Sequence, residues 1–355
     1  MRILAAVVAG PGSAPELTEV DLPPLGIDDV RIRVAATGVC HTDIAWAAGE
    51  YGDQFPAVLG HETAGVVEEV GRHDSPYAVG DRVVVALTNH CGTCANCERG
   101  SPILCDLRED PVARLTGLDG TPIWAAYAVG GFAEAAVVRA SSLVRIPGDV
   151  PFPVAAVVGC AVACGVGSVW NIAQVCPGST VVVLGAGAVG AAVVLGCVLA
   201  GAERVVVVDP SGPRQQSALA IGATEAVDAT DEVAERLSSE PFDYAFECVG
   251  KASAMETAVR LTRRGGTVTL MGAANREETF RLNALEFVSS QRRLLASLGG
   301  NVQPHVDFPR YFALYRSGRL NLDALVTATA PLDGIAHAFV ANARATGLRT
   351  VVTMT

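Results

Sequence analysis

A glycine-rich turn, Gly185-Ala-Gly-Ala-Val-Gly190, restricts the possible folds of this chain more than any other segment. It follows the apolar run Thr180-Val-Val-Val-Leu184 and precedes small apolar residues, as expected of a buried strand that leads into a helix. Glycines at this spacing allow a tight turn, close approach of a pyrophosphate and close packing of helix on strand. The pattern predicts a dinucleotide site, with a glycine-rich core turn that binds no ligand as the alternative. The predicted contacts are Gly185, Gly187, Val189 and Gly190.

The region around this turn, from about residue 155 to 297, alternates between strand-like and helix-like segments. Valine-rich segments at 180–184, 204–209, 243–247 and 267–271 alternate with helical segments near 188–200, 213–221 and 252–262. This alternation is typical of a parallel sheet covered on both faces. Asp209 lies at the end of the second strand, where a carboxylate accepts ribose hydroxyls and repels a 2′-phosphate. We therefore predict a doubly wound α/β domain that binds NAD in preference to NADP.

The first 150 residues have a different pattern. Segments at 31–36, 64–70, 81–86 and 132–138 are separated by turns with glycine and proline, which is typical of β-structure. The pattern becomes mixed again after Gly300 and ends in a strand-like segment at 349–354. A length of 355 residues corresponds to about two domains. We predict a β-rich domain from residues 1–160 and 298–355, with the α/β domain, residues 161–297, inserted.

Charge and hydropathy exclude several classes of partner. The formal net charge is −11 and no basic block occurs, so neither nucleic acid nor an anionic membrane surface is expected to bind. Residues 181–202 are apolar over a length that could span a bilayer, but four glycines interrupt them. We interpret this segment as a strand, a turn and a helix. The apolar run near Met1 is too short for a signal peptide, so we expect a first strand there and a cytoplasmic protein.

Four of the ten cysteines lie within fifteen residues. Three are spaced two residues apart and the fourth follows, a pattern that can close a tetrahedral shell of thiolates around Zn²⁺. Four protein ligands leave no open position, so this zinc would be structural. Four free thiols and an iron–sulfur cluster are the alternatives. The cysteines of this cluster are Cys91, Cys94, Cys97 and Cys105.

Several motifs, taken in order, resemble the zinc-dependent medium-chain alcohol dehydrogenases over essentially the whole chain. They are GVCHTD (38–43), LGHETAGVVEEVG (59–71), CGTCANC with Cys105, VGCAVACGVGSV (158–169), GAGAVG (185–190) and LRTVV (348–352). The resemblance implies a GroES-like catalytic domain beside the Rossmann domain, and a second, catalytic zinc. No local spacing joins the residues of that second site, and periodicity alone would make Cys160 a buried apolar thiol.

The resemblance assigns a role to each candidate residue. It implies Cys40, His61 and Cys160 as ligands of the catalytic zinc, which leaves one position for water or a substrate oxygen. Glu62 matches a carboxylate behind the metal, Asp43 one that orients His61, and Thr42 a hydroxyl that passes on the alcohol proton. For the carboxylates Glu62 and Asp43 the alternative is a surface role, and the same holds for the two arginines among the cofactor contacts, Arg214 and Arg349. The implied cofactor contacts are His41 and Arg349 at the pyrophosphate and Arg214 near the adenosine ribose.

Three positions depart from the family pattern. Ala45 stands where many members have a histidine that carries the proton to solvent, Cys164 stands where most have threonine, and Leu87 permits bulky substrates. We expect reversible hydride transfer between NAD and a primary alcohol, aromatic or allylic, in a homodimer or homotetramer with two zincs per chain. The alternatives are a biosynthetic reductase of a larger carbonyl compound, a glutathione-dependent formaldehyde dehydrogenase, and a cofactor-binding protein without catalysis.

Overall fold

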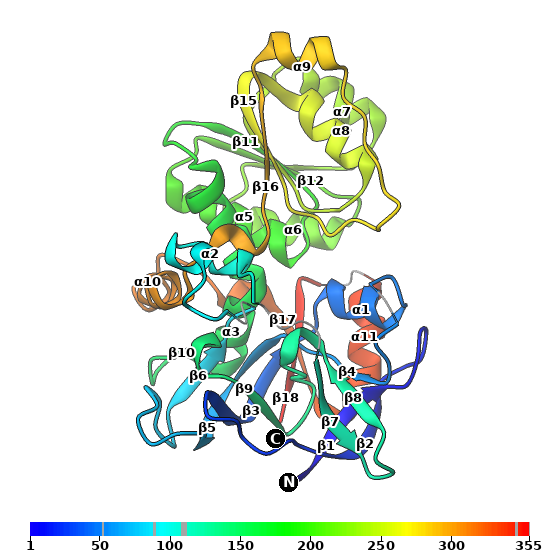
Figure 1. Ribbon diagram of the computed structural model, residues 1–355. Coiled ribbons are helices and arrows are strands. Elements are labelled where there is room, and N and C mark those ends of the chain that lie inside the picture. Colours follow the sequence, from blue (N-terminus) through cyan, green and yellow to red (C-terminus); the bar gives the residue numbers. More distant parts are fainter. Residues whose placement is uncertain (52, 88–89, 108–111, 345–346, 355) are drawn as a thin grey trace.

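The computed structural model describes residues 1–51, 53–87, 90–107, 112–344 and 347–354. Its strands form a closed barrel, a seven-stranded sheet and a six-stranded sheet. The six-stranded sheet lies at one end of the molecule, and both chain termini lie at the other (Figure 1).

The six-stranded sheet is parallel throughout, in the order β13-β12-β11-β14-β15-β16. Helices cover both faces, so the central strands are apolar without alternation: Val181, Val182 and Val183 of β11 are fully buried. The strand order reverses between β11 and β14, and ligands of such sheets bind at the carboxyl ends of the strands on either side of this point. The strands of this sheet are β11 (Thr180–Leu184), β12 (Arg204–Val208), β13 (Glu225–Val227), β14 (Phe242–Glu247), β15 (Thr262–Leu270) and β16 (Arg293–Ala296).

Five helices accompany this sheet, and the pattern of valine-rich segments did not predict all of its elements. Strands β13 and β16 and helices α7 and α9 were not predicted from the sequence. The helices are α5 (Ala188–Ala200), α6 (Gly212–Ala220), α7 (Asp231–Ser238), α8 (Ala252–Leu261) and α9 (Ala284–Ser290). As predicted, residues 181–202 form a strand, a glycine turn and a helix.

No charged side chain occurs in residues 150–202, and the part of this segment before β11 forms a helix in the core. Residues 152–173 form a continuous helix of α3 (Phe152–Val157), a π-helical turn (Val158–Val162), α4 (Ala163–Gly167) and a second π-helical turn (Ser168–Ala173). This helix is long and apolar enough to cross a membrane, but 83% of its most apolar window is buried inside the protein. It packs on α5 through glycine: a Cβ at Gly165 would lie 2.4 Å from Cβ of Ala192. We therefore assign it to the hydrophobic core.

The first 145 residues and the last 30 build the remaining two sheets (Figure 1). The barrel contains β1 (Arg2–Val8), β2 (Glu16–Asp21), β7 (Val112–Gly117), β8 (Pro122–Ala125) and β4 (Ala57–Val58). The second sheet contains β10 (Leu143–Arg145), β6 (Arg82–Val85), β5 (Glu62–Val70), β3 (Asp29–Gly38), β9 (Ala135–Arg139), β18 (Arg349–Thr353) and β17 (Val326–Pro331). The remaining helices are α1 (His41–Ala47), α2 (Ala95–Glu98), α10 (Pro304–Arg316) and α11 (Ile335–Ala343). The domain boundaries at 160 and 298 stay predictions, since the helix 152–173 runs through the first of them.

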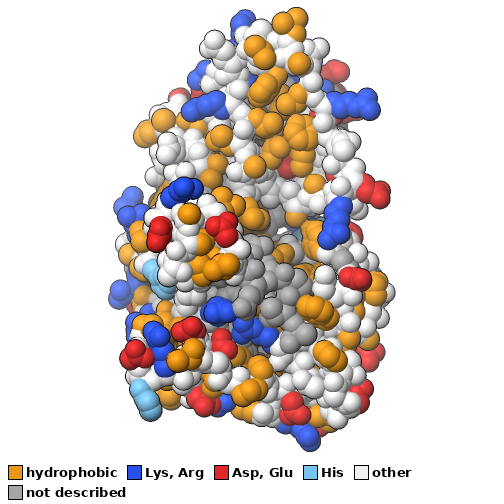
Figure 2. Space-filling model, in the orientation of Figure 1, with side chains coloured by type: hydrophobic (Ala, Val, Ile, Leu, Met, Phe, Trp, Pro, Cys, Tyr) orange, Lys and Arg blue, Asp and Glu red, His pale blue; other side chains and the backbone are white. Residues whose placement is uncertain are grey.

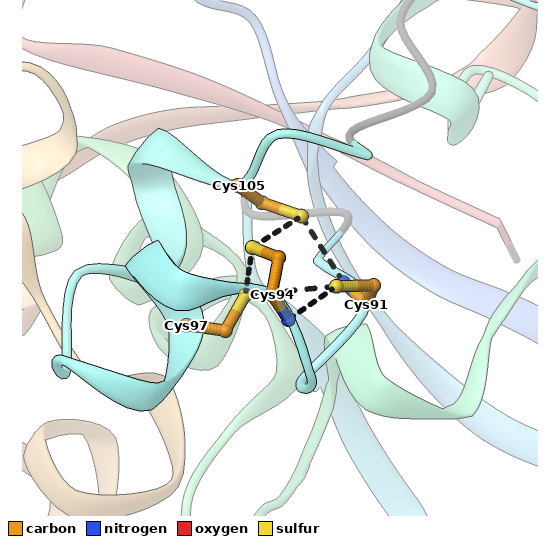
Figure 3. A group of neighbouring side chains, drawn as sticks. All are labelled: Cys91, Cys94, Cys97 and Cys105. Atoms are coloured by element: carbon orange, nitrogen blue, oxygen red, sulfur yellow. Dashed lines mark hydrogen bonds between the residues drawn. The ribbon is translucent and has the colours of Figure 1, made fainter.

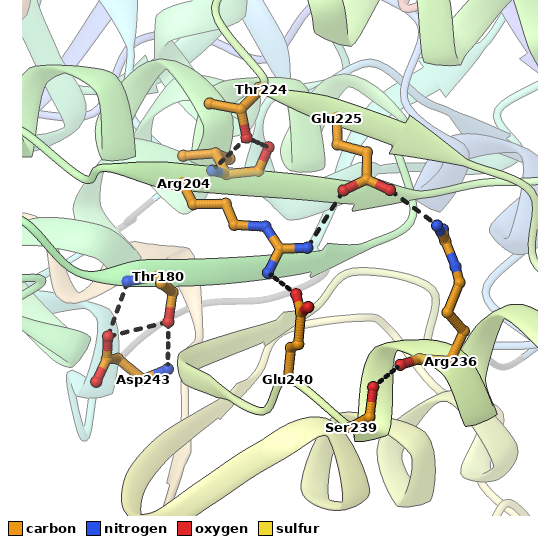
Figure 4. Close-up of polar contacts among 9 residues, drawn as sticks. Thr180, Arg204, Thr224, Glu225, Arg236, Ser239, Glu240 and Asp243 are labelled. Atoms are coloured by element: carbon orange, nitrogen blue, oxygen red, sulfur yellow. Dashed lines mark hydrogen bonds and ion pairs between the residues drawn. The ribbon is translucent and has the colours of Figure 1, made fainter.

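Polar side chains connect the strands of the six-stranded sheet at their starts (Figure 4). Asp243 at the start of β14 accepts hydrogen bonds from the backbone N and the hydroxyl of Thr180 on β11, at 2.8 and 3.0 Å. Arg204 on β12 binds Glu225 on β13 at 3.3 Å and Glu240 at 2.9 Å. These contacts fix the strand starts at the edge opposite the ligand crevice.

Candidate active site and metal centres

One cavity of about 900 Å³ brings together most of the residues singled out in the sequence. It extends from the carboxyl ends of β11 and β12, at Leu184 and Val208, to the start of α1. The two predicted carboxylates Asp43 and Glu62 and the four clustered cysteines do not line it. The predicted residues that do line it are Cys40, His41, Thr42, His61, Cys160, Gly185, Gly187, Val189, Gly190, Asp209, Arg214 and Arg349.

Glycine suits positions 185, 187 and 190 of the turn for a different structural reason in each case. Gly185 has a φ of +93°, which is strained for any residue with a Cβ. A Cβ at Gly190 would lie 1.8 Å from the carbonyl oxygen of Gly185, so only glycine lets α5 approach the strand. At Gly187, the N-terminal boundary of α5, the nearest atom to an added Cβ is Nη1 of Arg214, 4.0 Å away. The space at Gly187 and the N–H groups of the first turn of α5 suit a pyrophosphate.

Asp209 and Arg214 lie at the end of the cavity near β12. Asp209 is 3% exposed, and its carboxylate accepts hydrogen bonds from the backbone N of Ala186 and of Ser211, at 2.7 and 2.8 Å. The carboxylate thus connects the glycine turn to the loop after β12. Arg214 on α6 donates from Nε to the carbonyl of Gly347 at 3.4 Å. Burial lowers the pKa of its guanidinium.

A second group of potential metal ligands lies at the opposite end of the cavity. Cys40, His61, Glu62 and Cys160 each offer a ligand atom, and these atoms lie within 4.8 Å of one another. All four residues are buried. Two thiols and an imidazole are the soft and borderline donors that zinc prefers. Oε1 of Glu62 is ion-paired with Arg349, whereas Oε2 is buried with neither a hydrogen bond nor an ion pair among the residues that the structure describes, so an adjacent cation could satisfy Oε2. The donor set therefore fits a zinc ion.

Asp43 holds this group in place from the first turn of α1. Its Oδ1 lies 3.1 Å from Nδ1 of His61 and accepts from the backbone N of Gly60 at 3.0 Å. Its Oδ2 accepts from the backbone N of Cys40 at 2.8 Å. Because Asp43 engages Nδ1, the ring nitrogen of His61 that remains for a metal is Nε2. A single buried carboxylate thus orients two of the candidate ligands.

Glu62 and Arg349 form a buried ion pair behind the candidate ligands. Nη2 of Arg349 lies 3.0 Å from Oε1 of Glu62 and 3.8 Å from Sγ of Cys40, while Nη1 donates to the carbonyl of Val39 at 2.6 Å. Burial raises the pKa of Glu62 to about 7, although Arg349 acts in the opposite direction. Nε of Arg349 is buried without a hydrogen bond among the described residues, and Arg349 also lines the cavity. It can therefore contact both the Glu62 carboxylate and an anion in the cavity.

The four clustered cysteines lie in a separate lobe that carries α2 and a 3₁₀ turn, Pro102–Leu104 (Figure 3). Their Sγ–Sγ distances include 3.5 Å for Cys94–Cys97, 3.9 Å for Cys94–Cys105 and 4.0 Å for Cys91–Cys97. Four sulfurs at 2.3 Å from a tetrahedral zinc lie about 3.8 Å apart. Disulfide bonds require about 2.05 Å. Hydrogen bonds from Thr93 help to lower the pKa of Cys91 to about 6. This cluster also fits zinc.

Sequence reasoning missed two aromatic residues of the cavity. Tyr51 and Tyr127 both line it, together with Leu87 and Cys164, which the sequence had singled out. No local motif marks either tyrosine, since Tyr51 follows α1 and Tyr127 lies in a turn after β8. Only the folded chain brings Tyr127 beside His61 and Tyr51 into the same cavity. Ala45 is 3% exposed within α1.

Comparisons with known proteins agree with this geometry. Residues 26–148 match the alcohol dehydrogenase GroES-like domain, and residues 188–317 match the zinc-binding dehydrogenase domain. Alcohol dehydrogenase 2 of Zea mays is 31% identical over all of this chain and 98% of its own length.

Two solved structures resemble the whole chain. The benzyl alcohol dehydrogenase of Acinetobacter calcoaceticus superposes with a TM-score of 0.93 at 28% identity, over all of both chains. A Sinorhizobium meliloti protein solved with bound NADP gives a TM-score of 0.84 at 27% identity, again over all of both chains. The predicted fold, a Rossmann domain with a GroES-like domain, is confirmed. The chain belongs to the zinc-dependent medium-chain alcohol dehydrogenase family.

Proposed function

We propose that this alcohol dehydrogenase uses NAD and transfers hydride reversibly between the cofactor and a primary alcohol, with aromatic and allylic alcohols as its main substrates. One observation supports this most strongly. The thiol and imidazole group of Cys40, His61 and Cys160 opens into the same cavity as the glycine turn that suits a pyrophosphate. A nicotinamide cofactor in that cavity and a substrate at the metal ligands would therefore meet.

We propose two zinc ions per chain with separate roles. Cys40, His61 and Cys160 would hold the catalytic ion, with Glu62 behind them. Cys91, Cys94, Cys97 and Cys105 would hold the structural ion. The catalytic zinc supplies a Lewis acid for the substrate oxygen, and the nicotinamide supplies the hydride acceptor or donor.

The protein's own residues orient the reactants and move the proton. Asp43 fixes His61 and the backbone of Cys40, so that the ligand atoms converge before a substrate arrives. Thr42 lies at the start of α1 and lines the cavity, where its hydroxyl can accept the alcohol proton and pass it on. Buried Arg349 places positive charge beside the cavity, near the expected pyrophosphate.

The preference for NAD depends on Asp209. Its buried carboxylate already accepts two backbone hydrogen bonds, so it is held in place at the end of β12, where we expect the ribose 2′-position of the cofactor. Two negative charges in contact are unfavourable, and a penalty of about 2.7 kcal/mol corresponds to roughly a hundredfold in kcat/KM. The similar Sinorhizobium meliloti protein was solved with bound NADP, so the preference of this enzyme for NAD needs a direct test.

The cofactor test compares Asp209→Gly with a matched acidic control. We expect wild type to favour NAD, and Asp209→Gly to lower the NAD/NADP ratio of kcat/KM by at least about tenfold. Asp228→Asn removes an exposed acid from the same region outside the cavity and should leave the ratio unchanged. Equal use of both cofactors by wild type, or an unchanged ratio in Asp209→Gly, rejects the assignment.

The substrate proposal is supported by Leu87 and by the structural similarity to a benzyl alcohol dehydrogenase. Its test is a steady-state assay with NAD and benzyl alcohol, before and after treatment with a chelator, followed by a panel of alcohols and aldehydes in both directions. We expect benzyl or allylic alcohols to rank first and chelation to abolish turnover. A larger carbonyl compound, or formaldehyde with glutathione, as the best substrate would establish one of the alternatives instead.

We also propose a homodimer or homotetramer in the cytoplasm. Strand β16 is the edge of the six-stranded sheet, and α9 beside it exposes Leu285 and Val288 at 80% and 74%. Hydrophobic side chains gather over this end of the molecule (Figure 2). An open strand edge with an exposed apolar patch is typical of an interaction surface.

A further inference from the structure

Tyr127 adopts a backbone conformation that is unfavourable for a bulky residue. Its φ is 52° and its ψ is 28°, and φ of the following Ala128 is 55°. Left-handed conformations of this kind persist only where surrounding contacts hold them, and they occur preferentially at functional sites. Glycine would adopt this turn without strain, and Gly130 and Gly131 come only after Ala128 and Val129. The ring of Tyr127 therefore needs a reason beyond the turn itself.

The conformation places the ring beside His61, on the wall of the cavity that the candidate metal ligands also line. Tyr127 is half-buried, although its neighbours in the chain, residues 125–126 and 128–133, are all buried. The ring centroid of Tyr127 lies 4.9 Å from that of His61, with the planes tilted by 54°. It lies 5.7 Å from that of Trp46, in an edge-to-face arrangement at 66°. Trp46 is 6% exposed, so it supports Tyr127 from the interior.

The ring of Tyr127 thus forms an aromatic wall of the cavity directly beside His61. Leu87 and Leu298 add apolar surface to the same cavity, and Thr42 on α1, the helix that carries Trp46, lines it as well. We propose that Tyr127 is a specificity-determining residue that packs against the ring of an aromatic alcohol or aldehyde and favours it over a saturated ring of the same size. This inference deepens the proposed function and rests on it. Aromatic pairs contribute free energy beyond the area they bury, and a saturated ring lacks that contribution.

The test uses two substrates that differ only in the ring. Benzyl alcohol and cyclohexylmethanol present the same reacting carbon and nearly the same size. The variants are Tyr127→Phe, which keeps the aromatic ring, and Tyr127→Ala and Tyr127→Gly, which remove it. Tyr127→Gly also relieves the left-handed strain, so it keeps the test valid where Tyr127→Ala fails to fold. For each variant, the kcat/KM for benzyl alcohol is divided by that for cyclohexylmethanol, and this ratio is compared with the wild-type ratio. The comparison removes the intrinsic difference in reactivity between the two alcohols.

We expect the ratio of kcat/KM for benzyl alcohol over cyclohexylmethanol to fall about two- to tenfold in Tyr127→Gly and Tyr127→Ala, and to persist in Tyr127→Phe. Calorimetry of benzamide against cyclohexanecarboxamide, on the holoenzyme with NADH, should show the same loss of discrimination in binding. Zinc content and far-UV circular dichroism control for folding. An unchanged ratio in an active, folded Tyr127→Gly overturns the inference. A wild type that oxidises neither alcohol with NAD refutes the proposed function instead.

Discussion

At the scale of single residues, we expect Thr42 and Ala45 to decide how the alcohol proton leaves. Thr42 lines the cavity at the start of α1, whereas Ala45, one turn later, is 3% exposed beside the buried Trp46. A histidine at position 45 would have to displace packed neighbours, and overpacking of this kind typically costs about 1–3 kcal/mol. We therefore expect the proton to pass from Thr42 into the cavity, with the cofactor ribose and water as its acceptors.

We predict that Thr42→Val lowers kcat for alcohol oxidation by about 10²- to 10⁴-fold, the range typical of a lost acid–base group. Thr42→Ser keeps the hydroxyl and should retain most of the activity. Ala45→His should lower stability without raising kcat, and added imidazole buffer should leave kcat unchanged. Steady-state rates with a primary alcohol measure all three effects. An active Thr42→Val, or a faster Ala45→His, contradicts this proton route.

At the scale of elements, the contact between β11 and β14 provides a test of stability. Asp243 accepts two hydrogen bonds from Thr180 and one from Nε of Arg263 at 2.6 Å. Although partial burial acts in the opposite direction, the hydrogen bonds from Thr180 and Arg263 lower the pKa of Asp243. A lowered pKa in the folded state means that this contribution to stability is present above the ordinary pKa of 3.8 and is lost as the pH falls below it.

Asp243→Asn should therefore lower the free energy of unfolding at pH 7 by about 1–3 kcal/mol, the typical cost of weakening hydrogen bonds to a charged group. The difference from wild type should shrink near pH 3. Urea unfolding followed by circular dichroism at both pH values measures it. Glu19→Gln removes an exposed carboxylate for which no partner is found among the described residues, and should have little effect. A difference that is independent of pH would mean that the Asp243 charge is not responsible.

The cysteine lobe is a second element whose role can be tested. A structural metal contributes to folding directly, whereas a catalytic one need not. Cys97→Ser and Cys105→Ser should reduce zinc from two ions to one per chain. They should also lower Tm by more than about 5 °C. In domains of 150–250 residues, a loss of 1 kcal/mol in the free energy of unfolding lowers Tm by about 2–4 °C.

Two further cysteines serve as comparisons for this test. Cys160→Ser should remove one zinc and the activity while largely preserving Tm. Cys176→Ser, at an exposed cysteine outside both ligand groups, should change neither quantity. Elemental analysis and calorimetry measure these effects. One zinc or none in fully active wild type would refute the two-metal proposal.

The elements that the sequence predicts are those with a strong local signal. The valine run of β11 is buried on both faces and the glycine turn has one geometry, so both follow from a few adjacent residues. Helix 152–173 was not predicted because it is apolar on all sides and has no polar face to reveal its period. Strand β13 was not predicted because it has no apolar run: it is three residues long, lies at the edge of the sheet and is only half-buried.

The candidate site also shows that sequence predicts local groups of residues better than distant ones. The cysteine lobe is local in sequence and was found by spacing alone. Cys40, His61 and Cys160 come from three separate segments, and only family resemblance connected them before the fold did. Tyr127 has no motif at all, because its position beside His61 depends on the turn after β8 and on support from Trp46. Contacts between distant segments arise from packing, which no short pattern encodes.

At the scale of the whole molecule, the exposed end formed by α9 and β16 predicts how copies associate. Leu294 and Leu295 of β16 are half-buried, and Leu285 and Val288 of α9 extend the apolar surface to the open edge of the sheet. A two-fold interface places the same patch of both copies in contact, so each substitution acts twice. A double variant, Leu285→Asp with Val288→Asp, should therefore introduce four carboxylates into an apolar contact. We expect the mass in solution, measured by light scattering after size exclusion, to halve.

Val79→Asp is the matched control, because Val79 is 69% exposed and lies outside this patch. It should leave the mass unchanged. If wild type is a monomer at micromolar concentration, the proposed oligomer does not exist. If the double variant is folded but keeps the wild-type mass, the copies associate through another surface. A smaller species from a tetramer would be a dimer, and from a dimer a monomer, so the same measurement also distinguishes the two proposed assemblies.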